Sequence, residues 1–304
     1  MNAVLKNIIE KAVSTSDSEF SALVRNVASI QKKERSNGIV GDSVVNEGLV
    51  RVKQGRKLIL VGDLHGDLES LATILHRSGF IDDLSNIIIF LGDYGDRGQE
   101  SVEVYYVTLY LKSRFSDRVI LMRGNHEGPS DLPFMPHDLP NQIIGKFGNT
   151  GSVVYQELRT LFDLMYHGVL LKNSYLILHG GVPVTFSSVS DIANANKTHP
   201  KIRHLEEILW NDPLEIKGSE PSARGYGRYF GKDVTEQALK ITNTKALIRA
   251  HEPCNGFKLN HDGLVLTLFS CKVPYGNANA SYLAIDQKNC DLDAEGLARI
   301  VELF

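Results

Sequence analysis

The sequence contains few cysteines and no long apolar run. Only three of its 304 residues are cysteine, and their wide spacing argues against a disulfide framework or a thiolate zinc site. No stretch approaches the ~20 apolar residues that span a bilayer, and charged side chains interrupt residues 1–13, unlike a signal peptide. The formal net charge of −3 gives no reason to expect nucleic acid as a partner. The sequence therefore predicts a cytoplasmic protein that binds neither nucleic acid nor a membrane.

The composition is otherwise that of an ordinary globular protein. Hydrophobic residues make up 42% and charged residues 23% of the chain, and there is no internal repeat or low-complexity linker. The segment from Ser16 to Glu19 fits a capping box, and an apolar helical stripe follows it, which packs on its own domain or binds a partner. We expect a helical extension over residues 1–50 that packs on a larger domain over residues 51–304.

Five short apolar segments each run into a turn that carries Asp, Asn or His. These segments are residues 57–61, 87–91, 119–122, 175–178 and 246–248. Apolar runs of this length are typical of buried strands, and helical patterns between them indicate an α/β fold with right-handed crossovers. A single such turn could be an ordinary loop, because Asp and Gly are common turn residues. Five such turns in succession favour a functional site at the carboxyl ends of the strands.

The polar residues at these strand ends form a mixed set of oxygen and imidazole ligands without a thiolate. The set consists of Asp63, His65, Asp93, Asn125, His179 and His251. Such ligands suit Mn²⁺, Fe or Zn²⁺ better than Ca²⁺, which prefers oxygen alone. Six groups are too many for one tetrahedral site, but they suit two ions about 3.5–4 Å apart that share a carboxylate. The alternative for each histidine is a hydrogen-bonded residue of the core.

The same turns resemble the signature blocks of the PPP-family serine/threonine protein phosphatases, which belong to the calcineurin-like metallophosphoesterases. The blocks are residues 62–66 (Gly-Asp-Leu-His-Gly), 92–98 (Gly-Asp-Tyr-Gly-Asp-Arg-Gly) and 123–127 (Arg-Gly-Asn-His-Glu). Later landmarks at residues 179–181, 210–213, 249–251 and 268–270 follow in the family's order, so the resemblance covers about residues 58–286. It implies a metallophosphoesterase catalytic domain over 51–304, an α/β fold of two mixed β-sheets packed face to face and flanked by helices (an αββα sandwich).

The resemblance also implies a role for each motif residue. One metal ion would be held by Asp63, His65 and Asp93, and a second by Asp93, Asn125, His179 and His251. His126 would be the general acid that protonates the leaving alkoxide, with Asp96 orienting its imidazole. Arg97 and Arg123 would hold the phosphoryl oxygens, with Arg224 as a further phosphate-binding residue and Tyr275 beside the site. Alternatives remain, since Asp96 could cap a helix and the arginines could form structural ion pairs.

The sequence departs from the family pattern in two places. Gly95 stands where the family commonly has Val, and we expect it to loosen the turn. The loop after residue 270 places Tyr275 one residue late, which puts sensitivity to natural-product inhibitors in doubt. The remaining histidines match no motif and are predicted to be surface or core residues; they are His76, His137, His167, His199, His204 and His261.

Taken together, the residues and the resemblance predict an enzyme. It would be a phosphomonoesterase with two divalent metal ions, Mn²⁺ first with Fe or Zn²⁺ as alternatives. It would hydrolyse phosphoserine and phosphothreonine in proteins by direct attack of a metal-bound hydroxide. One alternative is a hydrolase of small phosphate esters or dinucleoside polyphosphates that uses the same site. Another is a catalytically silent binding module, against which the complete ligand set argues.

Overall fold

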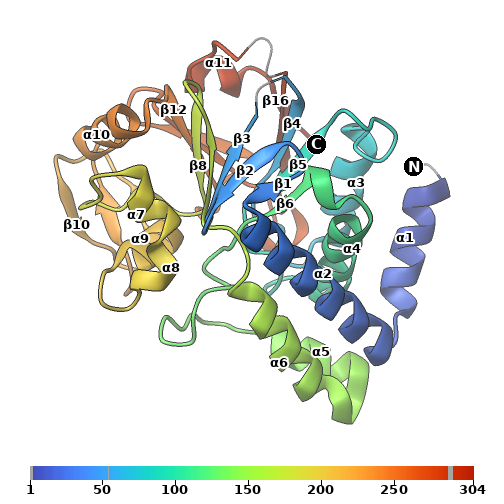
Figure 1. Cartoon of the computed structure of the whole chain (residues 1–304). Helices are drawn as coiled ribbons and strands as arrows, with labels where there is room; N and C mark the ends of the chain where they lie inside the picture. Colours follow the sequence, from blue (N-terminus) through green and yellow to red (C-terminus); the bar gives the residue numbers. More distant parts are fainter. Residues whose placement is uncertain (1–2, 54, 287–289) are drawn as a thin grey trace.

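Two β-sheets lie between two groups of helices in the computed structural model, which describes residues 3–53, 55–286 and 290–304 (Figure 1). The five-stranded sheet has the order β16-β15-β4-β5-β6 and the eight-stranded sheet the order β1-β2-β3-β7-β8-β12-β14-β13. Strands β4, β5 and β6 are parallel, while β15 is antiparallel to both β4 and β16. Strand β12 is parallel to both of its neighbours, β8 and β14, and β7 is antiparallel to β8. Both sheets are therefore mixed.

The strands are short. The five-stranded sheet contains β4 (Lys57–Val61), β5 (Ile87–Phe90), β6 (Val119–Leu121), β15 (Ser281–Asp286) and β16 (Val301–Leu303). The eight-stranded sheet contains β1 (Ile39–Val40), β2 (Ser43–Asn46), β3 (Leu49–Val52), β7 (Gly168–Leu171), β8 (Tyr175–Leu178), β12 (Ala246–Arg249), β13 (Phe257–Asn260) and β14 (Val265–Leu268). A small third sheet is formed by β9 (Asp212–Pro213), β10 (Ser219–Pro221) and β11 (Arg228–Phe230).

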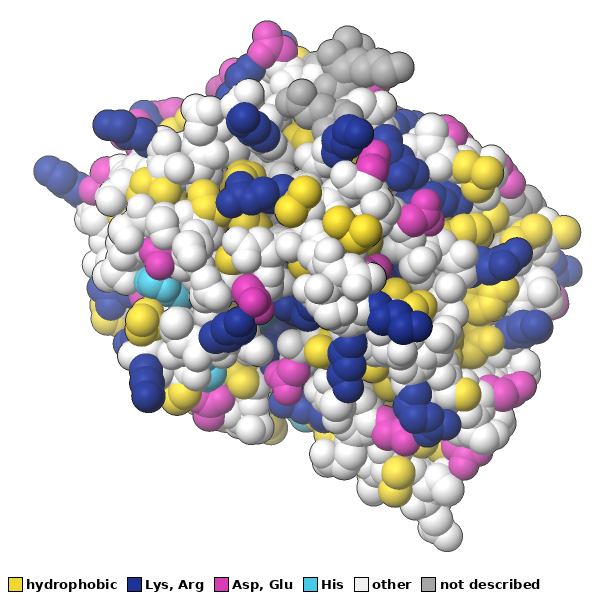
Figure 2. Space-filling model, in the orientation of Figure 1, with side chains coloured by type: hydrophobic (Ala, Val, Ile, Leu, Met, Phe, Trp, Pro, Cys, Tyr) yellow, Lys and Arg dark blue, Asp and Glu magenta, His cyan; other side chains and the backbone are white. Residues whose placement is uncertain are grey.

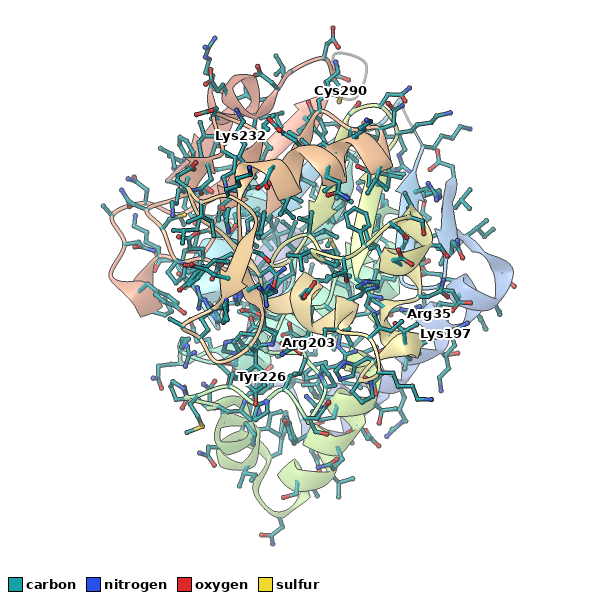
Figure 3. All side chains as sticks on the ribbon, turned by 90° about the vertical axis from the view of Figure 1, so that its left-hand side faces the viewer. Arg35, Lys197, Arg203, Tyr226, Lys232 and Cys290 are labelled. Carbon is teal, nitrogen blue, oxygen red and sulfur yellow. The ribbon has the colours of Figure 1, made fainter. Side chains whose placement is uncertain are left out.

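Helices cover the outer face of each sheet. The five-stranded sheet is covered by α1 (Ala3–Ser14), α2 (Asp17–Asn37), α3 (Leu68–Arg77), α4 (Ser101–Arg114), α5 (Leu139–Phe147) and α6 (Gly151–Phe162). The eight-stranded sheet is covered by α7 (Val189–Ala193), α8 (Ala195–Thr198), α9 (His204–Trp210) and α10 (Lys232–Thr242). Figure 3 views this second layer face on and labels Lys232 of α10 and Arg203 just before α9. Short 3₁₀ turns are η1 (Ser116–Arg118), η2 (Gly148–Thr150) and η3 (Val273–Tyr275).

The hydrophobic core forms three layers that match this arrangement. Alternate residues of β4 point to opposite sides, so Leu58 and Leu60 pack between the sheets while Ile59 and Val61 pack against the helices. The third layer lies between the eight-stranded sheet and helices α7 to α10. The structure thus confirms the predicted αββα sandwich.

The N-terminal helices pack on the five-stranded sheet's helical layer, as expected. Ser16 and Glu19 form the predicted capping box at the start of α2, and Gly38 ends that helix in the left-handed conformation. The helical part stops at Asn37, however, and strands β1 to β3 belong to the eight-stranded sheet. Residues 39–50 therefore do not form part of a helical extension. The division between an extension and a catalytic domain stays a prediction.

The segment over residues 293–303, whose apolar pattern also fits a helix, is helical only in its first half. Helix α11 (Ala294–Ala298) is short, and the chain then continues as β16, which pairs antiparallel with β15. In so short a segment the apolar residues fit the helical period and the strand period equally well. The segment forms a strand because it can pair with the otherwise free edge of β15.

Charged side chains are mixed on the surface, and Figure 2 shows Lys and Arg scattered over one face with Asp and Glu between them. Among the described residues, no helix combines the length and the apolar character needed to cross a bilayer.

Candidate active site

The predicted ligand residues lie where strands of both sheets end. Asp63 follows β4, Asp93 follows β5 and Asn125 follows β6, all in the five-stranded sheet. His179 follows β8 and His251 follows β12 in the eight-stranded sheet. Since the carboxyl ends of parallel strands meet at one edge of a sheet, the two packed sheets present these side chains to a single place.

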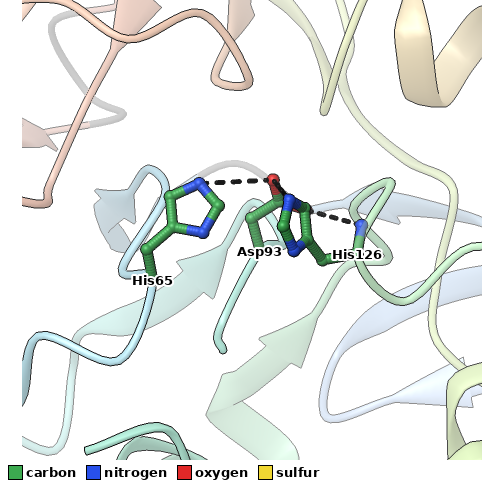
Figure 4. A group of neighbouring side chains, drawn as sticks. All are labelled: His65, Asp93 and His126. Carbon is green, nitrogen blue, oxygen red and sulfur yellow. Dashed lines mark hydrogen bonds and ion pairs between the residues drawn. The ribbon is translucent and has the colours of Figure 1, made fainter. Parts of the chain in front are cut away.

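A first group of ligand atoms surrounds the imidazole of His65, which Figure 4 draws beside Asp93. Its Nδ1 lies 3.1 Å from the carbonyl oxygen of Gly95 and donates to it, so Nε2 presents a lone pair. This Nε2 lies 3.6 Å from Oδ2 of Asp63 and 3.6 Å from Oδ2 of Asp93. The Oδ2 atom of Asp63 is buried without a hydrogen-bond partner. Lone pairs that face one another in a buried place fit a cation between them.

A second group of ligand atoms lies on the other side of Asp93. Nδ1 of His179 donates to the carbonyl oxygen of Leu91 at 2.9 Å, so its Nε2 presents a lone pair 3.5 Å from Oδ1 of Asp93. The amide oxygen of Asn125 lies 3.2 Å from Nε2 of His179 and 3.0 Å from Nδ1 of His251. Turning this amide over would point its nitrogen at the same atoms. With the oxygen inward, the four side chains offer ligand atoms to a second cation.

Burial determines the charge of these groups. It lowers the pKa of His179 to about 4 and the pKa of His251 well below its usual range. Burial, together with the carboxylates of Asp63 and Glu127, raises the pKa of Asp93 well above its ordinary value. Neutral imidazole is the form that binds metal ions, and bound cations would offset the cost of burying neighbouring carboxylates. Among the described residues, two compact groups of candidate metal ligands share Asp93: one is completed by His65 and His126, the other by His179 and His251.

The site also concentrates unusual backbone conformations. Ten described residues other than glycine have a positive φ, and half of them lie here: His65, Asp93, Asp96, Arg97 and His251. Each left-handed residue costs about 1–3 kcal/mol and persists only where its surroundings hold it in place. The tight turns that aim these side chains therefore depend on the sheets beneath them.

His126 and Asp96 form a hydrogen-bonded pair next to the ligand atoms. Nδ1 of His126 lies 2.8 Å from Oδ2 of Asp96. Its Nε2 lies 3.9 Å from Oδ2 of Asp93, the pair that Figure 4 draws. Burial lowers the pKa of His126 to about 3. Burial opposes ionisation of Asp96, but hydrogen bonds from His126 and His137 outweigh it and lower the pKa of this carboxyl. An ionised carboxylate only accepts hydrogen bonds, so Nδ1 of His126 carries a proton and Nε2 remains free to exchange one.

A cavity of about 450 Å³ opens over these groups. Its walls combine the polar groups His65, Asp93, Asn125, His126, His251, Arg97, Arg224 and Tyr275 with the apolar side chains of Pro133, Phe134, Met135, Trp210 and Pro253. The cavity places ligand residues, a proton-exchanging imidazole and two guanidinium groups around one volume. This is an arrangement suited to a phosphorylated substrate.

Three of the four residues predicted to face the phosphoryl group line this cavity. The guanidinium of Arg97 donates to the carbonyl oxygens of Met135 and Pro136 at 3.2 and 2.8 Å. Nε of Arg224 donates to Asp212 at 2.6 Å. The ring of Tyr275, on η3, lies 5.3 Å from the His65 ring, so the altered loop still brings this tyrosine to the site.

Arg123 does not line the cavity. Its side chain is fully buried, and its guanidinium donates to the carbonyl oxygen of Glu127 at 2.7 Å and to Asp163 at 2.7 Å. Asn196 accepts a third hydrogen bond at 3.1 Å. The prediction that Arg123 holds phosphoryl oxygens is therefore not supported by its position, because its hydrogen bonds are used inside the protein.

Glu127 holds two of the catalytic turns together. Its carboxylate accepts the backbone N–H groups of Asp93 at 2.8 Å, Tyr94 at 3.2 Å and Gly124 at 3.0 Å. The hydroxyl of Tyr105 donates to it at 2.5 Å. The residue thus ties the turn after β5 to the turn after β6.

His137 also belongs to this site, although the sequence placed it among surface or core residues. Its Nδ1 lies 3.1 and 3.2 Å from the two carboxylate oxygens of Asp96. The two residues are 41 positions apart, and no recognised spacing joins them. The only signal was its place in the segment after His126, which contains Pro129, Pro133, Pro136 and Pro140.

The fold and the ligand set together define a metal-dependent phosphoesterase, and comparisons with known proteins agree. The family described as "Calcineurin-like phosphoesterase" matches residues 56–255. A protein serine/threonine phosphatase from Saccharomyces cerevisiae has the same fold, with a TM-score of 0.77 over 98% of this chain and 95% of that one at 24% identity.

Sequence relatives narrow the assignment. The chain is 32% identical over 230 residues to the serine/threonine-protein phosphatase 4 catalytic subunit of Saccharomyces cerevisiae, covering 75% of this chain and 72% of that protein. It is also 32% identical over 252 residues to a probable serine/threonine-protein phosphatase of Encephalitozoon cuniculi, covering 81% of this chain but only 54% of the relative. The chain therefore belongs to the calcineurin-like phosphoesterases and, within them, to the serine/threonine protein phosphatases.

Proposed function

We propose that this protein hydrolyses phosphoserine and phosphothreonine in proteins and that two divalent metal ions serve the reaction. Its relatives are named as serine/threonine-protein phosphatases, which supports the substrate class. The observation that carries the proposal is the convergence, at one cavity, of two groups of ligand atoms around Asp93 and the His126–Asp96 pair. Asp63, His65 and Asp93 would hold one ion.

The second ion would be held by Asp93, Asn125, His179 and His251. When bound, the two ions supply Lewis acidity toward phosphoryl oxygens and a water molecule of lowered pKa. Mn²⁺ is our first proposal for the metal, and Fe or Zn²⁺ would suit the same mixed ligands.

The chain's own residues bind the phosphoryl group and deliver a proton. Arg97 and Arg224 line the cavity with guanidinium groups, which pair with phosphoryl oxygens in fixed geometry. His126 would first take up a proton at Nε2 and then pass it to the leaving alkoxide, while its Nδ1–H stays bonded to Asp96. A positioned acid of this kind contributes about 10²–10⁴-fold, because an alkoxide is a poor leaving group.

The cytoplasmic location expected from the sequence stays a proposal, which the three free cysteines support. The absence of nucleic acid or membrane partners likewise stays a prediction.

The decisive experiment is hydrolysis of a phosphothreonine peptide by metal-stripped protein, with and without added Mn²⁺. We expect activity to return with the metal and to be lost in Asp93→Asn, because Asp93 belongs to both ligand groups. Diadenosine tetraphosphate and an aryl phosphate serve as competing substrates. Metal-dependent cleavage of either one, with none of the peptide, would keep the chemistry and reject the protein substrate. No hydrolysis of any substrate would reject the enzyme.

A further inference from the structure

The carboxylate of Asp96 accepts more hydrogen bonds than its pairing with His126 explains. Its Oδ1 accepts the backbone N–H groups of Asp138 at 2.6 Å and Leu139 at 2.7 Å. Its Oδ2 accepts from Nδ1 of His126 at 2.8 Å. The Nδ1 atom of His137 lies 3.1 Å from Oδ1 and 3.2 Å from Oδ2, so it bridges the two oxygens. All four donors except His126 come from one segment, residues 137–139.

His137 is itself held from the other side. Its Nε2 lies 2.8 Å from the hydroxyl of Tyr155 on α6. An ionised Asp96 only accepts hydrogen bonds, so Nδ1 of His137 carries a proton, and Nε2 on the other side of the ring is hydrogen-bonded to the hydroxyl of Tyr155. Two partners therefore fix both the ring orientation and the position of the proton.

An aromatic side chain connects the two imidazoles. The ring centroid of Phe134 lies 3.9 Å from that of His126 and 4.7 Å from that of His137. The imidazole of His126 thus contacts residues 134–139 twice, through Phe134 directly and through the carboxylate of Asp96. Rotation of Asp96 would move the hydrogen-bond acceptor away from His126.

We propose that His137 is a positioning residue for the proton donor, in that its Nδ1–H holds the carboxylate of Asp96 in the orientation that aims Nε2 of His126 at the leaving group. The inference rests on the proposed function, in which His126 protonates the leaving alkoxide. His137 does not line the cavity, so it acts through Asp96 and touches no substrate.

The chemistry of the leaving group separates this role from a merely structural one. Hydrolysis breaks the phosphorus–oxygen bond, and the oxygen of threonine leaves as an alkoxide that needs a proton. The phenolate that leaves 4-nitrophenyl phosphate is stable without one, so its release depends little on a general acid. Loss of the His137 hydrogen bond should therefore slow the first substrate more than the second.

Two substitutions distinguish the hydrogen-bond donor of His137 from its aromatic ring. His137→Phe keeps an aromatic ring against Phe134 but removes the N–H. His137→Asn removes the ring but keeps an amide N–H at the position of Nδ1. We expect His137→Phe to lower kcat for a phosphothreonine peptide about tenfold, the equivalent of one hydrogen bond to a charged group, with KM and the hydrolysis of 4-nitrophenyl phosphate nearly unchanged. We expect His137→Asn to retain most of the kcat.

His199→Phe is the matched control. Nε2 of His199 lies 2.9 Å from Oδ2 of Asp131, so this substitution loosens the loop that precedes residues 137–139 without touching Asp96. We expect it to affect both substrates alike. Equal losses on both substrates in His137→Phe, or equal damage in His137→Phe and His137→Asn, would overturn the proposal, and thermal unfolding of each variant identifies any that fail to fold.

The proposed function is tested separately by His126→Asn. A strong loss on the peptide with little loss on 4-nitrophenyl phosphate supports His126 as the proton donor. If His126→Asn discriminates between the substrates and His137→Phe does not, only the present inference fails. If neither discriminates, the role of His126 fails as well.

Discussion

Gly95 lies where the family commonly has Val, and the space that a side chain would fill is already occupied. A Cβ atom built on Gly95 would lie 2.9 Å from Cε2 of Tyr105 and 3.3 Å from Cβ of Ser101. Both neighbours have tasks at the site, since Tyr105 donates to Glu127 and Ser101 accepts the N–H of Asp96. The sequence suggested that this glycine loosens the turn. In the structure it instead leaves room for the ring of Tyr105 to pack against the turn.

We expect Gly95→Val to destabilise the protein by about 1–3 kcal/mol, the usual cost of overpacking a core. The ring of Tyr105 would have to move and leave Glu127 without its hydroxyl partner. Urea unfolding measures the change. Gly145→Ala is the control, because no atom lies within 4 Å of its added Cβ in α5 and alanine should stabilise that helix by about 0.5–1 kcal/mol. An unchanged stability of Gly95→Val would contradict the packing argument.

The arginines give a second prediction at this scale. Arg97 and Arg224 line the cavity, whereas Arg123 is buried and paired with Asp163. We expect Arg97→Ala and Arg224→Ala to weaken inhibition by inorganic phosphate at least about tenfold, the worth of one charge-assisted hydrogen bond. Arg123→Met should leave that inhibition constant within a factor of about two and lower stability, because it leaves the buried carbonyl oxygen of Glu127 without its guanidinium donor. The reverse pattern would restore the original assignment of Arg123.

Much of the candidate site could be predicted from single residues. Asp63, Asp93 and His251 each follow an apolar run. Such runs indicate buried strands, and the carboxyl ends of parallel strands lie together at one edge of a sheet. The direction of a side chain could not be predicted in the same way. Arg123 follows its strand like the others, yet it turns away from the cavity, because residues after a strand can point to either face. The contact of His137 with Asp96 depends on the path of a loop, which has no periodicity to read.

At the scale of elements, a buried ion pair joins α2 to α4. Nζ of Lys112 is fully buried and donates to Oε1 of Glu34 at 2.5 Å and to the carbonyl oxygens of Ser116 and Val119. The hydroxyl of Tyr166 donates to the other oxygen of Glu34 at 2.8 Å. Burial lowers the pKa of Lys112. The long N-terminal helix is thus connected to the core by charge as well as by apolar contact.

We expect Glu34→Leu to cost about 3–5 kcal/mol, because it leaves the ammonium of Lys112 buried without a counter-charge. The double variant Glu34→Leu/Lys112→Met should recover a large part of this loss, since it removes both charges. Chemical denaturation of the two variants and the wild type measures both changes. A double variant that is less stable than Glu34→Leu would show that the pair is not what joins the helices.

Elements with a clear period could be predicted well, and short ones could not. The sequence pattern predicts helices over residues 102–114 and 233–243, and α4 and α10 lie within one residue of these ranges. Strands β1 to β3 and β16 were missed because their few apolar residues fit several patterns, and only pairing with a neighbouring strand stabilises them.

At the scale of the whole molecule, His167 makes stability depend on pH. Its side chain is buried against Gly48, whose Cβ would lie 2.0 Å from Nδ1. Burial first, and then the charges of Arg35 and Arg123, lower the pKa of His167 to about 3. An unfolded chain binds a proton at this histidine below pH ~6.5, while the folded protein does not. The free energy of unfolding therefore falls as the pH drops from about 6.5 toward 3.

We expect the wild type to lose about 2 kcal/mol more than His167→Leu between pH 6.5 and 5, at a slope of about 1.4 kcal/mol per pH unit. Both proteins share their other titrating groups, so the difference isolates this histidine. Urea unfolding at a series of pH values provides the curves. Parallel curves for the two proteins would mean that His167 is protonated in the folded state.

The arrangement of layers could be predicted through the resemblance rather than from physics alone. Alternating strands and helices predict an α/β fold, but nothing local in the sequence places β7, β8 and β12 in a different sheet from β4, β5 and β6. The assignment of strands to one sheet or the other depends on which apolar faces fit together over the whole core. The pattern of residues along the chain does not give this information.

The division of the ligand residues between two sheets has a consequence for how activity arises during synthesis. The N–H of His251 donates to Oδ1 of Asp63 at 2.9 Å, across 188 residues of chain. During synthesis, Asp63 and Asp93 are added to the chain long before His251. A partly synthesised chain therefore contains ligand residues of the first sheet but lacks one from the second. Chains that end before His251 lack a ligand residue of the second group, and we therefore expect them to be inactive.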